Sequence, residues 1–505
     1  MKLPSLRRVP LPTSSSPSLA QSLHIWARNA SNESALLRAS LSLGLFQALP
    51  REPTSAPLSV EALAHQLGAS VRGTRALLEL LLCMGLVRMD DARGYTLSSS
   101  IAALLDDAGF HARLQAERPW WHPMGRLDEA LQQGGPVVED ADSWDVLGHY
   151  RELFLDPTKV STSAEAEDFF DRFARGAART QLLITVGRLG VLDALASGPQ
   201  SLTRLGETTK LSVEGLRVVL EVMATLGLVR EEAGVWDLTA DARPLLEGKA
   251  LAYLVRALSV SSRYWEALGR LDETVRTEHF ILDLKDPETS RRFYADNSQQ
   301  ITAVFATHFQ LGRKAVETLA QVRPLERAQV LDIGTGSGVW GAAFARATPT
   351  TQVTYFDQDV VLEQVRTNLE RLKVAERARF WPGDLLTHDF GEQAFDVIVL
   401  PQVLNVLRPE SLPGLFARVS RALKPDGVLL IAEYVLNERR DGPLEHLYFG
   451  LRRFMTNEGD LLSASEYAHL LKDVGLTASV CLPLPTQELI LATRSGVPLP
   501  SRLAA

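Results

Sequence analysis

Cysteine is almost absent from this chain of 505 residues: Cys83 and Cys481 are the only two, and each lies in an apolar run. Two cysteines exclude a disulfide framework and a thiolate metal cluster, so we predict no metal site and a reducing, cytoplasmic compartment. Long apolar runs are lacking as well. None reaches the about 18 residues that a membrane span requires, and we therefore expect no membrane partner.

A surplus of basic residues is also missing. The formal net charge is −8 at pH 7, which argues against a nucleic-acid partner. The first residues contain Lys2, Arg7 and Arg8 but no acidic residue, as a targeting segment would. Because they are rich in proline and serine and lack a continuous apolar segment, we interpret residues 1–24 as a disordered tail. The remaining length predicts about three domains.

An internal repeat organises the first two thirds of the chain. Residues 57–88 align without gaps to residues 199–230, with 13 of 32 positions identical. The likeness extends upstream, from LGLFQAL to LGVLDAL, and downstream, from WHPMGRLDE to WEALGRLDE. We infer a duplication. Residues 25–150 are called copy one, and residues 151–315, which include linking helices, are called copy two.

Each copy has the pattern of helices followed by a two-stranded wing. Leucines recur at helical spacing before each Gly-Leu-Val-Arg, and the second wing strand carries Tyr95 and Leu97 in copy one, Trp236 and Leu238 in copy two. This winged-helix outline is typical of DNA-binding regulators and of dimerisation modules. The helices expected at 70–85 and 212–227 are near neutral, whereas groove docking needs several Lys or Arg. We favour dimerisation-like domains over a ligand-sensing regulator.

From about residue 328 the pattern changes to alternating strands and helices. Strands are expected at AQVLDIG, TQVTYFD, RARFWPGD, FDVIVLP and GVLLIAEYV, and the chain closes with a predicted hairpin in TASVCLPLPTQELILAT. Residues 316–505 therefore form a predicted α/β Rossmann-like domain. Its sheet is mostly parallel with a C-terminal antiparallel hairpin, and ligands should bind at the carboxyl ends of the strands.

Two overlapping glycine patterns follow the first of these strands. Gly336-Ser-Gly338-Val-Trp-Gly341 fits the dinucleotide pattern G-x-G-x-x-G, whereas Asp332-Ile-Gly334-Thr-Gly336-Ser-Gly338 fits the D-x-G-x-G-x-G of S-adenosylmethionine enzymes. The first glycine after the strand is Gly334, so the second pattern is in register. Asp332 would repel a pyrophosphate but suits the ammonium group of S-adenosylmethionine.

Acidic residues end the next two strands as well. Asp357 can accept the ribose hydroxyls of either cofactor, and Asp384 can hold the adenine amino group of S-adenosylmethionine. These carboxylates could instead cap helices. Three of them at three successive strand ends favour the cofactor, and we predict S-adenosyl-L-methionine.

Residues from about 165 to 497 resemble the small-molecule O-methyltransferase family that includes caffeate, hydroxyindole and bacterial polyketide O-methyltransferases. The motifs that carry the resemblance are YWEALGRLDETVRT, VLDIGTGSG, YFDQDVV and FWPGDLL. It implies an S-adenosylmethionine-dependent methyltransferase that acts on a hydrophobic small molecule in natural-product metabolism. The cofactor contacts that it implies come from Gly334, Gly336, Asp357, Asp384, Leu385 and Gln402.

Copy one resembles only the N-terminal half of this family, and no second glycine loop follows it. Family members dimerise through the winged-helix domain. The extra copy in this chain allows two arrangements: an ordinary homodimer, or a pseudo-dimer in which copy one pairs with copy two.

One segment departs from the family. Where its members have a histidine that deprotonates the acceptor hydroxyl, this chain has Asn405, in VLNVL. An amide cannot accept a proton at neutral pH. In-line proximity is the larger part of methyl transfer, and general-base help is worth about 10²–10⁴-fold. O-methylation stays the main prediction; C-methylation and a non-methylating hydroxylation, decarboxylation or cyclisation are alternatives.

Another residue could supply the base. The resemblance places His446, in GPLEHLYFGLRRFM, in a segment that lines the acceptor pocket, and His308 precedes the domain. For each of them we favour the interpretation as an ordinary helix histidine over that of a base.

Overall fold

The computed structural model describes residues 17–51, 56–139, 141–156, 163–286, 288, 289, 292 and 298–504. They form two compact units, each made of two separate stretches of chain. Unit one contains Met1–Phe46 and Ser99–Asp272; unit two contains Gln47–Ser98 and Glu273–Ala505. The units therefore cut across the copies, since the winged helix of copy one belongs to unit two.

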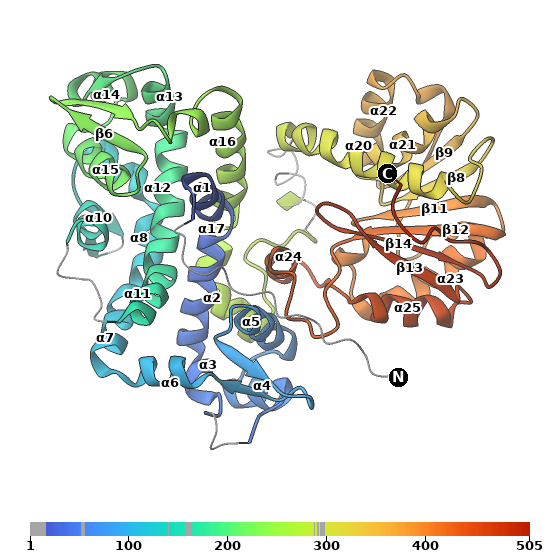
Figure 1. The fold of residues 1–505 in the computed structure, drawn as a ribbon, viewed down its shortest axis with the longest axis horizontal. Coiled ribbons are helices and arrows are strands. Elements are labelled where there is room, and N and C mark those ends of the chain that lie inside the picture. The colour runs from blue at the N-terminus through green and yellow to red at the C-terminus, as the bar shows by residue number, and fades with distance from the viewer. Residues whose placement is uncertain are drawn as a thin grey trace. The chain divides into compact units, whose positions relative to one another are not determined.

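Unit one is mainly helical. Copy one supplies α1 (Leu19–Arg28) and α2 (Ala30–Leu43), which pack against α12 (Gly176–Arg188) and α16 (Gly248–Arg263) of copy two (Figure 1). Helix α1 begins with a capping box between Ser18 and Gln21, so the predicted tail ends before residue 24; residues 1–16 lie outside the described residues. Copy one also contributes α6 (Ser99–Asp106), α7 (Ala108–Glu117), α8 (Trp121–Gly125), α9 (Leu127–Gln133) and α10 (Val146–Phe154). Copy two also contributes α11 (Ala164–Phe170), α13 (Val191–Ala196), α17 (Trp265–Gly269) and the start of α18 (Leu271–Thr277). Helix α18 continues past Asp272, where the unit ends.

Both copies contain the predicted winged helix. In copy two, β5 (Gln200–Ser201) comes before α14 (Leu202–Thr209) and α15 (Val213–Thr225), and β6 (Val229–Glu232) and β7 (Val235–Leu238) follow them. The three strands form an antiparallel sheet in the order β5-β7-β6. In copy one, α4 (Val60–Leu67) and α5 (Val71–Cys83) precede the antiparallel pair β1 (Val87–Met89) and β2 (Tyr95–Leu97). Both α5 and α15 begin at a serine whose side chain accepts the N–H of a glycine three residues later.

The two copies contact each other through equivalent residues. If the match of residues 43–49 with 189–195 is extended upstream, Ser34 corresponds to Thr180 and Trp26 to Arg172. Ser34 Oγ donates to the carbonyl of Arg172 at 2.5 Å, and Thr180 Oγ1 donates to the carbonyl of Trp26 at 2.6 Å. Each of these contacts recurs when the two copies are exchanged. This is the property of an isologous interface, in which both partners use the same surface.

Further contacts repeat this reciprocity. The N–H of Ser70 donates to the carbonyl of Val275 at 3.0 Å, and the N–H of the equivalent Ser212 donates to the carbonyl of Leu131, which is equivalent to Val275, at 2.9 Å. Trp121 and its equivalent Trp265 stack on each other with ring centroids 4.4 Å apart. The duplicated segments are therefore paired with each other within one chain.

The predicted α/β domain lies in unit two. Its seven described strands run in the order β10-β9-β8-β11-β12-β14-β13, and β14 alone is antiparallel to its neighbours, which confirms the mostly parallel sheet and the terminal hairpin. The strands are β8 (Gln329–Ile333), β9 (Gln352–Asp357), β10 (Ala378–Pro382), β11 (Phe395–Pro401), β12 (Leu423–Glu433), β13 (Ala478–Pro483) and β14 (Glu488–Thr493).

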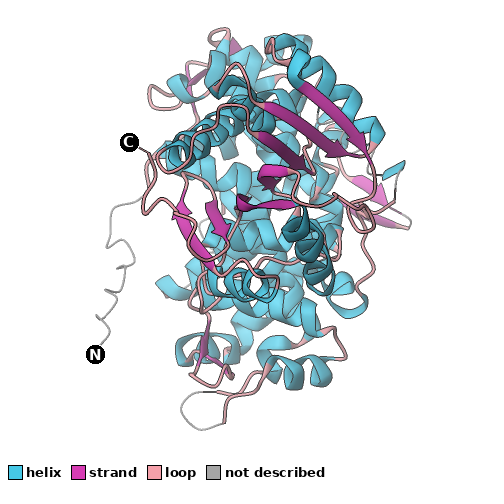
Figure 2. Cartoon of the chain, turned by 90° about the vertical axis from the view of Figure 1, so that its right-hand side faces the viewer, coloured by secondary structure: helices cyan, strands magenta, loops and turns pink. Residues whose placement is uncertain are grey.

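Apolar residues of each strand point alternately to two cores, one on each face of the sheet. Val330 joins the core under α20 (Ser298–Ala320), α21 (Val339–Ala347) and α22 (Asp359–Arg371), and its neighbour Leu331 joins the core under α23 (Leu412–Ala422) and α25 (Ala464–Asp473). Figure 2 shows strands of this sheet in magenta beside cyan helices. Helix α24 (Leu444–Thr456) lies outside these cores and packs against α5.

The strand order reverses between β8 and β11, because the chain proceeds outward in both directions from this pair. Such a switch point opens a crevice at the carboxyl ends of the strands, where α/β proteins bind ligands. Both cysteines are free, and no helix in the described part of the chain combines the length and apolarity needed to cross a membrane.

Candidate active site

The glycine loop connects β8 to α21 at the switch point. Gly334, Gly336 and Gly338 all have positive φ, a conformation that favours glycine. A Cβ atom at Gly334 would overlap Val403, and one at Gly338 would lie 2.7 Å from Val365, whereas one at Gly336 would meet nothing within 4 Å. The two outer glycines thus allow close packing, and the backbone of Gly336 faces open space where a ligand can approach.

Asp332 lies beneath this loop and has no exposed surface. Its Oδ2 accepts hydrogen bonds from Thr335 Oγ1 and from the N–H of Gly341, both at 2.8 Å. Burial raises the pKa of its carboxyl to about 7. Its Oδ2 ties the loop to the first turn of α21, whereas its Oδ1 is buried without a hydrogen-bond partner among the described residues, so the contact with an ammonium group stays a prediction.

Asp357 ends β9 and is hydrogen-bonded to the loop. Its carboxylate accepts the N–H of Gly336 at 2.9 Å and the N–H of Gln358 at 2.8 Å. Burial raises its pKa, and these two hydrogen bonds oppose the rise. Each carboxylate oxygen can accept a second hydrogen bond, so Asp357 fits a pair of ribose hydroxyls.

Asp384 follows β10, next to the strand that Asp357 ends. Its side chain is exposed, and Oδ1 accepts the N–H of Leu386 at 2.8 Å. Leu385 is half-buried. Two apolar side chains that follow β9 and β10 are exposed, Val360 with an exposed fraction of 60% and Leu386 with one of 47%. Exposed large apolar residues beside a polar crevice suit the faces of an aromatic base. The structure therefore offers the residues that an adenosine group requires.

Gln402 and Asn405 follow β11 on the other side of the switch point. Gln402 has a positive φ, and its side-chain amide donates to Gln487 Oε1. Asn405 is 2% exposed, and its Nδ2 lies 3.0 and 2.9 Å from the two carboxylate oxygens of Glu433. This orients the amide, since the Nδ2 hydrogens point at the carboxylate and Oδ1 remains as the acceptor.

Glu433 ends β12 and is fully buried. Besides the Asn405 side chain, it accepts the backbone N–H groups of Leu404 at 3.0 Å and Asn405 at 3.3 Å. Burial raises its pKa to about 7, against the effect of these hydrogen bonds. Our sequence reasoning missed this residue. An acidic residue at the end of the apolar run VLLIAE, as at the ends of two other strands, was the available signal.

His446 lies on α24 and is buried. Its Nδ1 is 2.8 Å from the carbonyl oxygen of Val435, so Nδ1 carries the proton and Nε2 the lone pair of the neutral ring. Because Val435 follows Glu433 by two residues, His446 and Asn405 both lie near the end of β12. His308 lies on α20, and burial lowers its pKa; no hydrogen bond among the described residues connects it to Asn405.

Comparison of the sequence with known protein families agrees with this geometry. The family model for the O-methyltransferase domain matches residues 278–477, and the model for the O-methyltransferase dimerisation domain matches twice, at residues 28–106 and 172–248. Together these matches span well over half of the chain.

The chain is also similar to individual O-methyltransferases. The chain is 27% identical to the mitomycin biosynthesis 6-O-methyltransferase of Streptomyces lavendulae, over 64% of this chain and 93% of the relative. The structure of mitomycin 7-O-methyltransferase MmcR superposes with a TM-score of 0.53 at 25% identity, over 66% of this chain and 98% of that one. Human N-acetylserotonin methyltransferase in complex with SAM shares the fold, with a TM-score of 0.53 at 22% identity, over 66% and 99% of the two chains. This chain belongs to the family of S-adenosylmethionine-dependent O-methyltransferases, with one methyltransferase domain and two dimerisation domains.

Proposed function

We propose that this enzyme methylates an oxygen atom of a hydrophobic small molecule in natural-product metabolism. The observation that carries the proposal is the buried pair of Asn405 and Glu433, which presents a fixed amide oxygen at the end of β11. Val403 precedes it by two residues and packs against Gly334 of the glycine loop, so the amide lies beside the cofactor crevice. The mitomycin relative supports the substrate class by its name.

We assign cofactor binding to the crevice on both sides of the switch point. The backbone of the glycine loop at Gly334 and Gly336 approaches the ligand, Asp357 accepts the ribose hydroxyls, and Asp384 accepts the adenine amino group. The side chains of Leu385, Leu386 and Val360 cover the base, and Gln402 lies toward the methionine end. When bound, S-adenosylmethionine supplies an electrophilic methyl group.

The acceptor is oriented by Asn405 in this proposal. Its Oδ1 accepts a hydrogen bond from a second donor group of the acceptor and so places the reacting hydroxyl oxygen against the methyl group, which leaves the hydroxyl proton for a base. Asn405 cannot take up the proton, and we assign that role to Nε2 of His446. Proximity remains the main source of the rate, since well-oriented reactants gain about 7–11 kcal/mol from positioning alone.

The same amide favours a second candidate function. An acceptor that needs no deprotonation would suit an asparagine at this position, as in C-methylation or in a non-methylating hydroxylation, decarboxylation or cyclisation. Mass spectrometry of a metabolite panel incubated with methyl-labelled S-adenosylmethionine tests both candidates. A labelled phenol or enol ether supports O-methylation; product formation without label, or label on carbon, supports the second candidate.

We also propose that the dimerisation domains pair within one chain and that no homodimer is needed. The reciprocal contacts of Ser34 with Arg172 and of Thr180 with Trp26 support this proposal, because each copy uses for its partner the surface that the other copy uses. A homodimer would need a second interface of this kind.

A further inference from the structure

Helix α5 of copy one contacts the methyltransferase domain within unit two. Nη2 of Arg72 donates to the carbonyl oxygens of Asn457 at 2.7 Å and Gly459 at 2.6 Å. The guanidinium group also lies 4.9 Å from the ring centroid of Phe454, over its face. One arginine of copy one thus holds the segment that follows α24.

This segment lies directly against Asn405. A Cβ atom at Gly459 would overlap the backbone carbonyl of Asn405 and would lie 2.9 Å from Cα of Val406. Only glycine fits between the two backbones. A shift of Gly459 would therefore move the backbone of Asn405, whose amide orients the acceptor in the proposed reaction.

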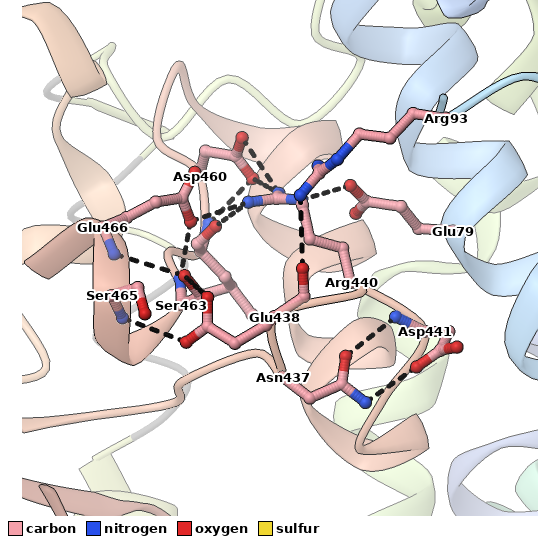
Figure 3. A network of polar contacts seen from close by, with 11 residues as sticks. Glu79, Arg93, Asn437, Glu438, Arg440, Asp441, Asp460, Ser463, Ser465 and Glu466 are labelled. Atoms are coloured by element: carbon pink, nitrogen blue, oxygen red, sulfur yellow. Dashed lines mark hydrogen bonds and ion pairs between the residues drawn. The ribbon is translucent and has the colours of Figure 1, made fainter. Parts of the chain in front are cut away.

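A second contact anchors the same helix. Glu79, seven residues or about two turns after Arg72, forms a buried ion pair with Arg440 (Figure 3). Arg440 also donates to the carbonyl of Leu461 at 2.9 Å and lies 3.3 Å from Asp460 and from Glu466. Burial alone would lower the pKa of Arg440, but the surrounding carboxylates raise it above its ordinary value. Arg440 joins copy one to the segment that Arg72 holds.

The equivalent helix of copy two keeps one of these two residues and lacks the other. The residue equivalent to Glu79 is Glu221, and the residue equivalent to Arg72 is Glu214, which pairs with Arg151 in a partly exposed ion pair. The residues that join the copies are shared, since Ser70 and Ser212 make the same hydrogen bond to equivalent partners. Copy one therefore differs from copy two at Arg72, the residue that contacts the segment after α24.

We propose that copy one is a positioning element of the active site: Arg72, acting through Gly459, holds Asn405 in place, and Glu79, acting through Arg440, holds the segment at residues 457–461. Copy one then controls catalysis without providing a catalytic residue. This inference rests on the proposed role of Asn405 for its effect on rate, but the mechanical link between Arg72 and Asn405 stands apart from that role.

Hydrogen exchange of the full chain with S-adenosylhomocysteine added tests the link directly. Arg72→Ala should speed exchange in peptides that cover residues 403–407 and 457–461, and Arg72→Lys should restore part of the protection. Glu214→Ala is the matched control at the equivalent position and should leave both peptides unchanged. Equal protection in Arg72→Ala and the natural protein, or an equal effect of Glu214→Ala, would overturn the proposal.

Kinetics with an acceptor from the metabolite panel give the second readout. Arg72→Ala should lower kcat by about 10- to 100-fold, the effect of a misplacement of about 1 Å, while the Kd for S-adenosylhomocysteine stays within about twofold. A parallel loss of cofactor affinity and melting temperature would mean a merely structural role and would contradict the proposal. If exchange responds as expected but no form of the protein transfers a methyl group, the proposed function fails and the positioning contact stands.

Discussion

Helices α5 and α15 occupy the same place in the two copies, yet they contact different parts of the chain. Both span 13 residues and begin at an equivalent serine, Ser70 or Ser212. Both use that serine to bond the other copy. Only α5 presents Arg72 and the buried Glu79 to a methyltransferase domain. Between the two helices, the serine that joins the copies is the same and Glu79 corresponds to Glu221, whereas Arg72 corresponds to Glu214.

The contacts of α5 also explain why the winged helix of copy one lies in unit two. Copy one has no methyltransferase domain of its own, but its winged helix belongs to the unit that contains the one methyltransferase domain. A second subunit could provide such a helix only by association. In the proposed pairing within one chain, the covalent connection would keep it at a high effective concentration and remove the dependence on protein concentration.

The stacked tryptophans join the two copies, so the loss of either ring should destabilise the protein to a similar extent. Trp121→Ala and Trp265→Ala each remove a buried aromatic ring from the same stacked pair, so each should lower the free energy of unfolding by about 3–5 kcal/mol. Trp121→Ala should cost slightly more, because the indole of Trp121 also donates to the carbonyl of Trp265 at 3.0 Å. Urea unfolding followed by circular dichroism measures both. The double variant should lose less than the sum of the two, since the residues touch; full additivity would contradict the pairing.

Glu79 on α5 should make the free energy of unfolding depend on pH. Burial raises the pKa of Glu79 from 4.5 to about 7, and the charge of Arg440 opposes the rise. The folded protein then binds this proton more tightly than the unfolded chain, so the stability that Glu79 contributes is present below about pH 4.5 and is lost as the pH rises through about 7.

Glu79→Gln does not titrate. The free energy of unfolding of the natural protein, relative to this variant, should therefore fall by about 3 kcal/mol between pH 4.5 and 7.5. Glu221→Gln, the same substitution at the equivalent position of copy two, provides the control. Parallel curves for Glu79→Gln and the natural protein would show that the two helices do not differ in this way.

Gly73 and Gly215 offer the smallest test. A Cβ atom would lie 2.8 Å from Cα of Val275 at Gly73 and 2.9 Å from Cα of Leu131 at Gly215. Alanine at either site adds helix propensity of about 1 kcal/mol but forces the two copies apart, at a cost of about 1–3 kcal/mol. Thermal unfolding should show a similar small loss of about 1 kcal/mol for each variant. A loss at only one of the two glycines would break the equivalence.

Much of the methyltransferase domain could be predicted because its signals are local. Glycines with positive φ after an apolar strand and acids at strand ends depend on short segments, and the structure places Gly336, Asp357 and Asp384 at the carboxyl ends of adjacent strands. Asp332 shows what a short segment does not report. Thr335 and Gly341 bind one oxygen of its carboxylate inside the core, and its ligand contact stays a prediction.

The roles of Glu433, Arg72 and Glu79 depend on contacts between distant segments. The residue pairs Arg72–Gly459 and Glu79–Arg440 are separated by 387 and 361 positions. A helix pattern reports which face is apolar, and it does not report which segment covers that face. The same repeat would be compatible with pairing within one chain or between two chains, so the sequence alone left both arrangements open.

The molecular mass in solution tests most directly whether the two copies replace a second subunit. Light scattering after size exclusion, over a wide range of protein concentration, should give the mass of one chain, 55.5 kDa. Methyl transfer per chain should stay constant over the same range. A stable mass of twice that value, or activity that falls on dilution as two chains separate, would contradict the account.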